Sequence, residues 1–216
     1  MSNEKHKIDP AKAHQAMRRI KQQHIDIFNF AKSVQSDGIE NLYNAWSTPT
    51  GKAAVGALKE GLNSCMSGEK HGDTVNKVYN WLMVKLNTLI TEYCKPEGIS
   101  YSTVSPESYG YPFKEEKAKI DNNYDGVLIN SSLKKVRKLY NNIEKNMNDT
   151  ITILTSGDFG LDGTEILDVA NTLKSKMKAV LGRVDEKINA CVNTLNSRSD
   201  TVKESVEAAR KNAKSN

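Results

Sequence analysis

Cysteine is scarce in this chain, and its placement excludes two common ways of stabilising a small fold. The 216 residues include only Cys65, Cys94 and Cys191. The number is odd, the spacing is wide and no Cys-x-x-Cys pair occurs, which argues against a disulfide framework and against a zinc site. We expect all three to be reduced, small apolar residues.

Long apolar runs are also missing. Nowhere does the sequence offer the roughly 20 consecutive apolar residues that a helix needs to span a bilayer. The first residues, MSNEKHKIDPAKAHQ, hold no apolar segment of a secretory signal peptide. We therefore expect a protein that is either secreted without a Sec signal peptide or cytoplasmic. Contact with a membrane is an open but disfavoured alternative.

The common catalytic signatures are lacking as well. There is no Gly-x-Ser-x-Gly, no Walker glycine loop and no His-Glu-x-x-His. No carboxylate or cysteine stands at helical ligand spacing from His14, His24 or His71. The net charge of +5 is scattered, without the basic and aromatic face of a nucleic-acid-binding protein. We predict a protein that is not an enzyme and that has no catalytic residue, cofactor, metal ion or nucleic-acid partner.

Helical periodicity is the strongest feature that is present. Apolar residues alternate steps of three and four in four stripes, which run from Ala13 to Val34, from Val75 to Tyr93, from Leu133 to Leu154 and from Ile166 to Leu195. No segment alternates with a period of two for long enough to form a sheet. We predict an all-α fold in which two antiparallel helical hairpins form an arrangement like a four-helix bundle.

The prolines, glycines and other turn residues between the stripes predict the organisation of the chain. Residues 1–95 should form a first hairpin, residues 96–129 a linker rich in proline and tyrosine, and residues 130–216 a second hairpin with a basic C-terminal tail. Gly38 should end the first helix and Asp73 should cap the helix of the second stripe. The four tyrosines of the linker either tie it onto the helices or form a recognition surface; they are Tyr101, Tyr109, Tyr111 and Tyr124.

Trp46 stands out because it directly precedes the turn sequence STPTG, in which Gly51 opens an alanine-rich run. Burial of so large an aromatic side chain removes roughly 150 to 250 Å² from water. We expect Trp46 to close the turn, the alternative being an exposed hot spot for a partner. The second hairpin has its own turn, TSGDFGLDG, in which Phe159 and Gly163 hold the corresponding places.

A helix, a turn with tryptophan and a second helix resemble the WXG (Trp-x-Gly) proteins of bacterial type VII secretion. In that family the Trp and Gly stabilise the bend of a helical hairpin, and two hairpins pair into a four-helix bundle. The resemblance gives these roles to Trp46 and Gly51, although the spacing here is Trp-x4-Gly and the second turn has no tryptophan.

The family's export signal, Tyr-x3-Asp/Glu after the second helix, finds its best-placed match in Tyr93 and Glu97. Two other matches begin at Tyr111 and Tyr140. Pro96 interrupts the helical turn that would bring Tyr93 and Glu97 to one face.

The resemblance implies a non-enzymatic helical protein that acts through helix-face docking, as a type VII secretion substrate or as its helper or chaperone. Its partner would be the secretion machinery, a co-secreted protein or a second copy of the chain. Two other classes stay open: a membrane-acting protein of the pore-forming kind, and a cytoplasmic coiled-coil scaffold. His24, on the first stripe, is expected to be a hydrogen-bonded core histidine, with a pH-sensitive packing switch as the alternative.

Overall fold

A computed structural model describes residues 8–69, 72–114, 123–161 and 163–214, without the side chains of residues 203, 206 and 208–214. Within these ranges the regular structure is entirely helical, and β-pairing is confined to two isolated bridges. The elements are α1 (Pro10–Val34), the π-helical turn η1 (Gln35–Glu40), α2 (Asn41–Ala45), α3 (Pro49–Ser67), α4 (Val75–Cys94), α5 (Gly126–Thr155) and α6 (Thr164–Lys214).

Short polar residues set the beginnings of four helices. Asp9 caps α1 and Thr48 caps α3, each followed by a proline at the first helical position, where no backbone N–H is needed. Thr74 caps α4 and Asp125 caps α5. The side chain of Asp125 accepts hydrogen bonds from two backbone N–H groups, those of Val127 and Leu128.

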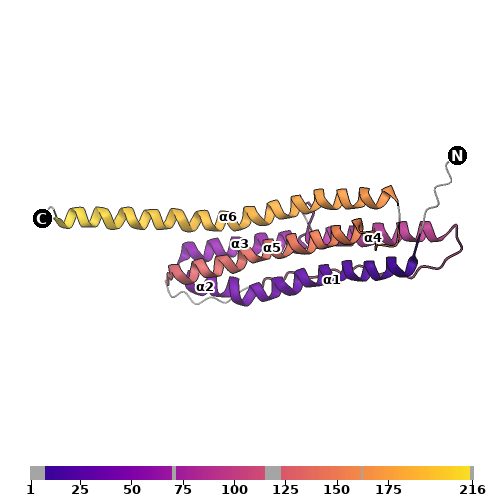
Figure 1. Cartoon of the computed structure of the whole chain (residues 1–216). Helices are drawn as coiled ribbons and strands as arrows, with labels where there is room; N and C mark the ends of the chain where they lie inside the picture. Colours follow the sequence, from indigo (N-terminus) through magenta and orange to yellow (C-terminus); the bar gives the residue numbers. More distant parts are fainter. Residues whose placement is uncertain (1–7, 70–71, 115–122, 162, 215–216) are drawn as a thin grey trace.

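The helices lie lengthwise in an elongated body (Figure 1). Helix α1 packs along α5 and α4, and α6 packs along α5, α3 and α4. Helices α3 and α4 follow one another along the body, so that together they match the length of one long helix (Figure 1). The two halves of the sequence therefore share one core, which lies between α1, the α3–α4 pair, α5 and α6.

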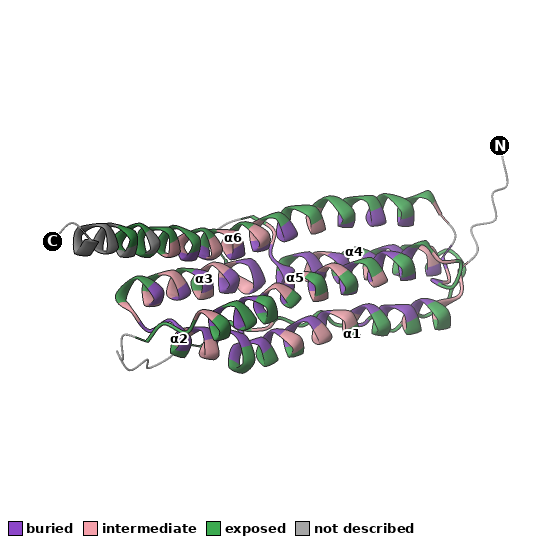
Figure 2. Ribbon diagram, turned by 60° about the vertical axis from the view of Figure 1, so that its left-hand side comes forward, coloured by how far each residue is buried: buried purple, intermediate pink, exposed green. Residues whose placement is uncertain are grey.

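The apolar stripes supply that core. Met17, Leu82, Val136 and Leu173, one from each stripe, are completely buried. Figure 2 shows exposed residues along the distal part of α6, which projects past the other helices. Leu195 is the last buried residue of α6 among the described side chains, and Val202 is 50% exposed.

Three expectations from the sequence need correction. Gly38 does not end the first helical run, which continues through η1 and α2; instead Gly38 is buried where a Cβ would lie 3.0 Å from Val136 Cγ2 of α5. The missing side chain thus permits close packing. Thr74, not Asp73, caps α4, and Asp73 pairs with Lys176 at 3.0 Å. Helix α5 begins at Gly126, inside the range 96–129 given to the linker.

Candidate functional site

Trp46 is buried at the end of α2, where the chain turns into α3, and none of its side chain reaches solvent. Gly51, in the first turn of α3, lies directly against it. A Cβ on Gly51 would overlap the Trp46 carbonyl oxygen and the indole ring. The structure therefore brings together the two residues that the sequence singled out for the first turn, and close packing requires glycine at position 51.

The Trp46 turn also holds the beginning of α5. The backbone N–H of Asp125 donates to the carbonyl of Ala45 (2.9 Å), and Ser47 N–H donates to the carbonyl of Asn123 (3.0 Å). The Ser47 hydroxyl accepts from Asn123 N–H at 2.9 Å. These bonds join segments more than 75 residues apart in sequence, so the turn positions α5 as well as α3.

Phe159 and Gly163 lie in the turn between α5 and α6, at the opposite end of the body. Phe159 is 1% exposed, and Gly160, at a φ of 84°, accepts a hydrogen bond from Asp9 N–H at 2.7 Å. A side chain at Gly163 would crowd the Tyr93 hydroxyl, whose oxygen lies 3.0 Å from the place of a Cβ. This second turn thus packs onto the beginning of α1 and the end of α4.

Tyr93 and Glu97, the candidate export motif, take different roles at that end. The Tyr93 hydroxyl donates to Glu165 Oε2 of α6 (2.8 Å), and Glu97 is exposed. Gly98, at a φ of 64°, ends the turn that carries Glu97: its N–H bonds to Lys95 O, and Ile99 N–H bonds to Cys94 O. This pair of bonds is a Schellman motif.

Residues 99–114, which we call the strap, run back along the groove between α1 and the α3–α4 pair. On the α1 side, His14 Nδ1 donates to the carbonyl of Ser102 (2.9 Å), and Lys21 forms an ion pair with Glu107 at 2.5 Å. Gln35 Oε1 accepts from Lys114 N–H at 3.2 Å. The strap is therefore tied to α1 and to the first residue of η1.

Asparagines on the other side of the groove hold the strap's main chain. The side-chain amide of Asn87 donates to the carbonyl of Val104 (2.8 Å) and accepts from the N–H of the same residue (3.1 Å). Asn63 does the same for Phe113, at 2.8 and 3.0 Å. Asn76 likewise pairs with both main-chain groups of Tyr109, at 2.5 and 3.2 Å.

The linker tyrosines divide between two environments. Tyr101 and Tyr109 pack against the core, and the Tyr101 hydroxyl donates to Asn87 Oδ1. Tyr111 and Tyr124 are 60% and 46% exposed. Half of the set thus fastens the linker to the helices.

His24 of α1 joins the strap to the core. Its ring stacks on Tyr79 of α4 with centroids 4.6 Å apart, and Nε2 donates to Asn76 Oδ1 at 3.0 Å. It also makes an edge contact with Tyr109 of the strap. The prediction of a buried, hydrogen-bonded histidine is confirmed.

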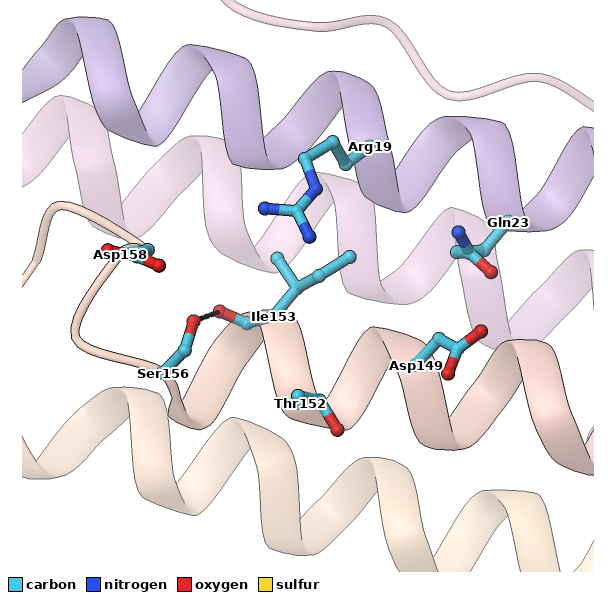
Figure 3. Close-up of a pocket in the computed structure, with 7 residues that line it drawn as sticks. All are labelled: Arg19, Gln23, Asp149, Thr152, Ile153, Ser156 and Asp158. Atoms are coloured by element: carbon cyan, nitrogen blue, oxygen red, sulfur yellow. Dashed lines mark hydrogen bonds between the residues drawn. The ribbon is translucent and has the colours of Figure 1, made fainter.

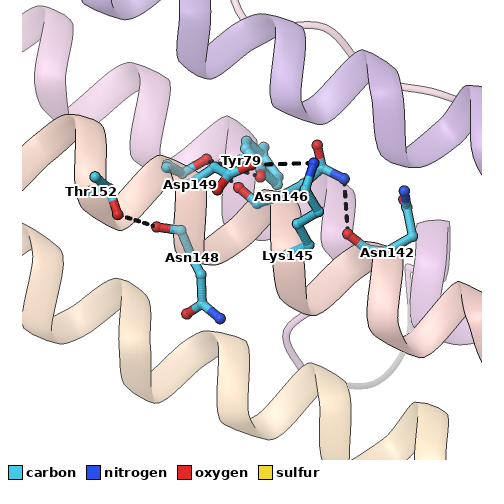
Figure 4. Close-up of polar contacts among 8 residues, drawn as sticks. Tyr79, Asn142, Lys145, Asn146, Asn148, Asp149 and Thr152 are labelled. Atoms are coloured by element: carbon cyan, nitrogen blue, oxygen red, sulfur yellow. Dashed lines mark hydrogen bonds and ion pairs between the residues drawn. The ribbon is translucent and has the colours of Figure 1, made fainter.

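The same chain of contacts continues into α5 (Figure 4). The hydroxyl oxygens of Tyr79 and Thr150 are 3.1 Å apart, and the Thr150 hydroxyl donates to the carbonyl of Asn146. A hydroxyl has a single proton, so Tyr79 is the donor to Thr150. One continuous set of contacts therefore links α5, α4, α1 and the strap.

Two surface hollows lie elsewhere on the body. One, of about 310 Å³, lies between α1 and α5, with the Arg19 guanidinium above Ile153 and Asp158 at one end (Figure 3). The other, of about 370 Å³, lies between α3 and α6, where small and apolar residues such as Ala54 and Cys191 line it together with the charged Glu60 and Lys187.

Other features were sought within the described residues alone. These contain no group of three His, Cys, Asp or Glu side chains that could hold a metal ion. The described part of each helix is too short or too polar to cross a membrane. All three cysteines are buried and unpaired, as expected.

Comparison with protein-family models, with curated proteins and with solved structures gave no significant match. The structure alone therefore describes the protein: it is helical throughout its described regular structure, it has a turn in which Trp46 is buried against Gly51, and its strap lies between α1 and the α3–α4 pair.

The asparagines of the groove were missed in the sequence. Asn76, Asn80 and Asn87 recur at steps of four and seven on α4, which places them on one helical face. These asparagines bind the strap, which contacts them only in the folded chain. Their spacing therefore predicts that they share a helical face, but it does not predict which segment they bind.

The contact between Trp46 and Gly51 predicts opposite effects at two glycines of α3. Gly51→Ala should lower the free energy of unfolding by roughly 1 to 3 kcal/mol, because the added methyl group overlaps Trp46. Gly56→Ala, whose nearest neighbour is the Tyr43 hydroxyl at 3.8 Å, should raise it by roughly 0.5 to 1 kcal/mol through helix propensity. Urea unfolding of the two variants measures both; changes of the same sign would show that the turn is not tightly packed.

The burial of His24 predicts sensitivity to acid. Burial lowers the pKa of His24 from 6.5 to about 4, against opposing effects of the Asn76 hydrogen bond and the Glu107 charge. The folded chain keeps the ring neutral while the unfolded chain takes up a proton. Its contribution is therefore complete above about pH 6.5 and decreases as the pH falls toward 4, by roughly 3 kcal/mol in all.

Urea unfolding at pH 7.5 and 4.5 tests this contribution. His24→Phe keeps an aromatic ring beside Tyr79 but cannot titrate, so it should lose less stability than the wild-type chain between the two pH values. Equal losses in both proteins would assign the acid sensitivity to other groups.

Proposed function

We propose that this protein is a non-enzymatic docking protein of the type VII secretion kind, either an exported substrate or a helper that pairs with one. The observation that carries the proposal is the buried contact of Trp46 with Gly51 in the turn between helical segments. The resemblance to WXG proteins rests on these two residues, and their packing supports the structural role that it implies.

The arrangement of the helices adds support. In this proposal α1 with the α3–α4 pair forms one hairpin, and α5 with α6 forms the other. Helix α1 packs along α5, and α3 packs along α6, so each hairpin buries apolar residues of the other. The chain is then a single-chain counterpart of the family's two-hairpin bundle, whose core needs no separate partner.

The projecting part of α6 is the proposed docking element. Beyond Leu195 the described side chains are mostly exposed, and this part of the helix extends past the body (Figures 1 and 2). Exposed side chains on a projecting helix can be recognised by a partner helix without rearrangement of the core.

Export by a type VII system is the direct test. A tagged chain expressed in a host with such a system should appear in the culture medium, and deletion of the system's ATPase should retain it in the cells. A cytoplasmic marker protein controls for lysis. Detection in the lysate alone, with no exported protein co-purifying, would contradict both forms of the proposal.

The candidate export motif can be tested in the same assay. Glu97→Ala should reduce export roughly thirtyfold, the loss expected when a hot-spot contact of about 2 kcal/mol is removed. Glu92→Ala is the matched control, because both glutamates are exposed near the end of α4. Equal export of the two variants would remove Glu97 from the signal while leaving the export proposal intact.

A further inference from the structure

The strap is bound as a β-strand is bound by its neighbour, although its neighbours are helices. Asn63, Asn76 and Asn87 each donate to the carbonyl and accept from the N–H of one strap residue. On the strap, these bonds involve main-chain atoms alone. They therefore fit any extended segment, whatever its side chains, with the exception of proline at the bonded positions.

The spacing of two asparagines matches an extended ligand. Asn76 and Asn87 are 11 positions apart (87 − 76), which on a helix corresponds to about 16.5 Å. Their strap partners Tyr109 and Val104 are five positions apart (109 − 104), which in an extended chain also corresponds to about 16.5 Å. The spacing of these two asparagines on α4 therefore matches that of two residues in an extended segment.

Three side chains and one charge supply the selectivity. Val104 and Phe113 are buried, at 7% and 3% exposure, and Tyr109 stacks on Phe28 with ring centroids 4.7 Å apart. Glu107 pairs with Lys21. The groove therefore accepts an extended segment with a carboxylate two residues before an aromatic residue and a second large apolar residue four positions after it.

The rest of the strap contributes little to this fit. Most residues between these anchors are exposed, including Ser105, Pro106 and Tyr111. An exogenous segment needs only the anchors and a free main chain to make the same contacts.

We propose that the groove between α1 and the α3–α4 pair is an extended-peptide-binding site. The strap occupies it as an intramolecular ligand, which an extended segment of a partner protein with the acidic and aromatic pattern replaces. The inference goes beyond helix-face docking and holds whether or not the protein is exported.

The test uses the full chain with a weakened strap. In the variant with Val104→Ser, Tyr109→Ser and Phe113→Ser, the cis ligand loses its anchors. A fluorescent synthetic peptide with the sequence of residues 101–114 should bind this variant in an anisotropy titration. It should bind the wild-type chain at least about tenfold more weakly, because a tethered strap competes at an effective concentration in the millimolar range.

Two control variants distinguish peptide binding in the groove from non-specific peptide binding elsewhere on the protein. Asn76→Ala, added to the weakened strap, should reduce peptide affinity about tenfold through the loss of two hydrogen bonds. Asn171→Ala, at an exposed position of α6, should not change it. Equal affinity in the two variants, or equal binding of a scrambled peptide, would overturn the proposal, as would failure of the folded variant to bind.

A milder variant keeps the test decisive if the triple substitution unfolds the chain. Tyr109→Ser alone removes the half-buried anchor, and this variant should still bind the peptide more tightly than the wild-type chain does. A concentration-dependent dimer of the wild-type chain that Tyr109→Ser abolishes would assign the groove to a second copy and overturn the assignment to a partner.

Discussion

The return of the chain from α4 to α5 depends on how the strap satisfies its main-chain hydrogen bonds. Helix α4 ends at one end of the body and α5 begins at the other, so the connection must return along the full length of the helices (Figure 1). Buried main-chain groups that lack a partner are costly, and this segment has no strand beside it among the described residues. Asn63, Asn76 and Asn87 take the place of that strand.

The asparagine contacts connect the strap, which lies at the surface, to residues of the core. Asn76 bonds the strap and also accepts from His24, whose ring stacks on Tyr79. Tyr79 in turn donates to Thr150 of α5. The strap is therefore linked through successive contacts to the interface of α4 and α5.

Much of the fold could be predicted from the sequence because it follows from local periodicity. The stripes that contain Leu82 and Leu173 were placed on helices, and both residues are buried there. The predictions that were wrong concern features that depend on contacts between residues distant in sequence. Gly38 looked like a stop for the helix, yet its missing side chain serves the approach to Val136. The binding of the strap could not be predicted for the same reason, since no local sequence pattern pairs Asn87 with Val104.

The burial of Trp46 follows from a signal that is local in the sequence. A tryptophan before Ser, Thr, Pro and Gly gives a local reason for burial, and Trp46 is buried against Gly51. Whether this turn and the Tyr93 and Glu97 pair serve export stays a prediction, because contacts within the chain do not bear on export.

Hydrogen exchange of the strap's backbone amides tests the central claim, that asparagine side chains hold this segment in place. In the wild-type chain the N–H groups of Val104, Tyr109 and Phe113 should exchange more slowly than those of Thr103 and Gly110, which lie beside them. Asn76→Ala should speed exchange at Tyr109 most of all. Uniform exchange along residues 101–114, or no change at Tyr109 in the variant, would contradict the account.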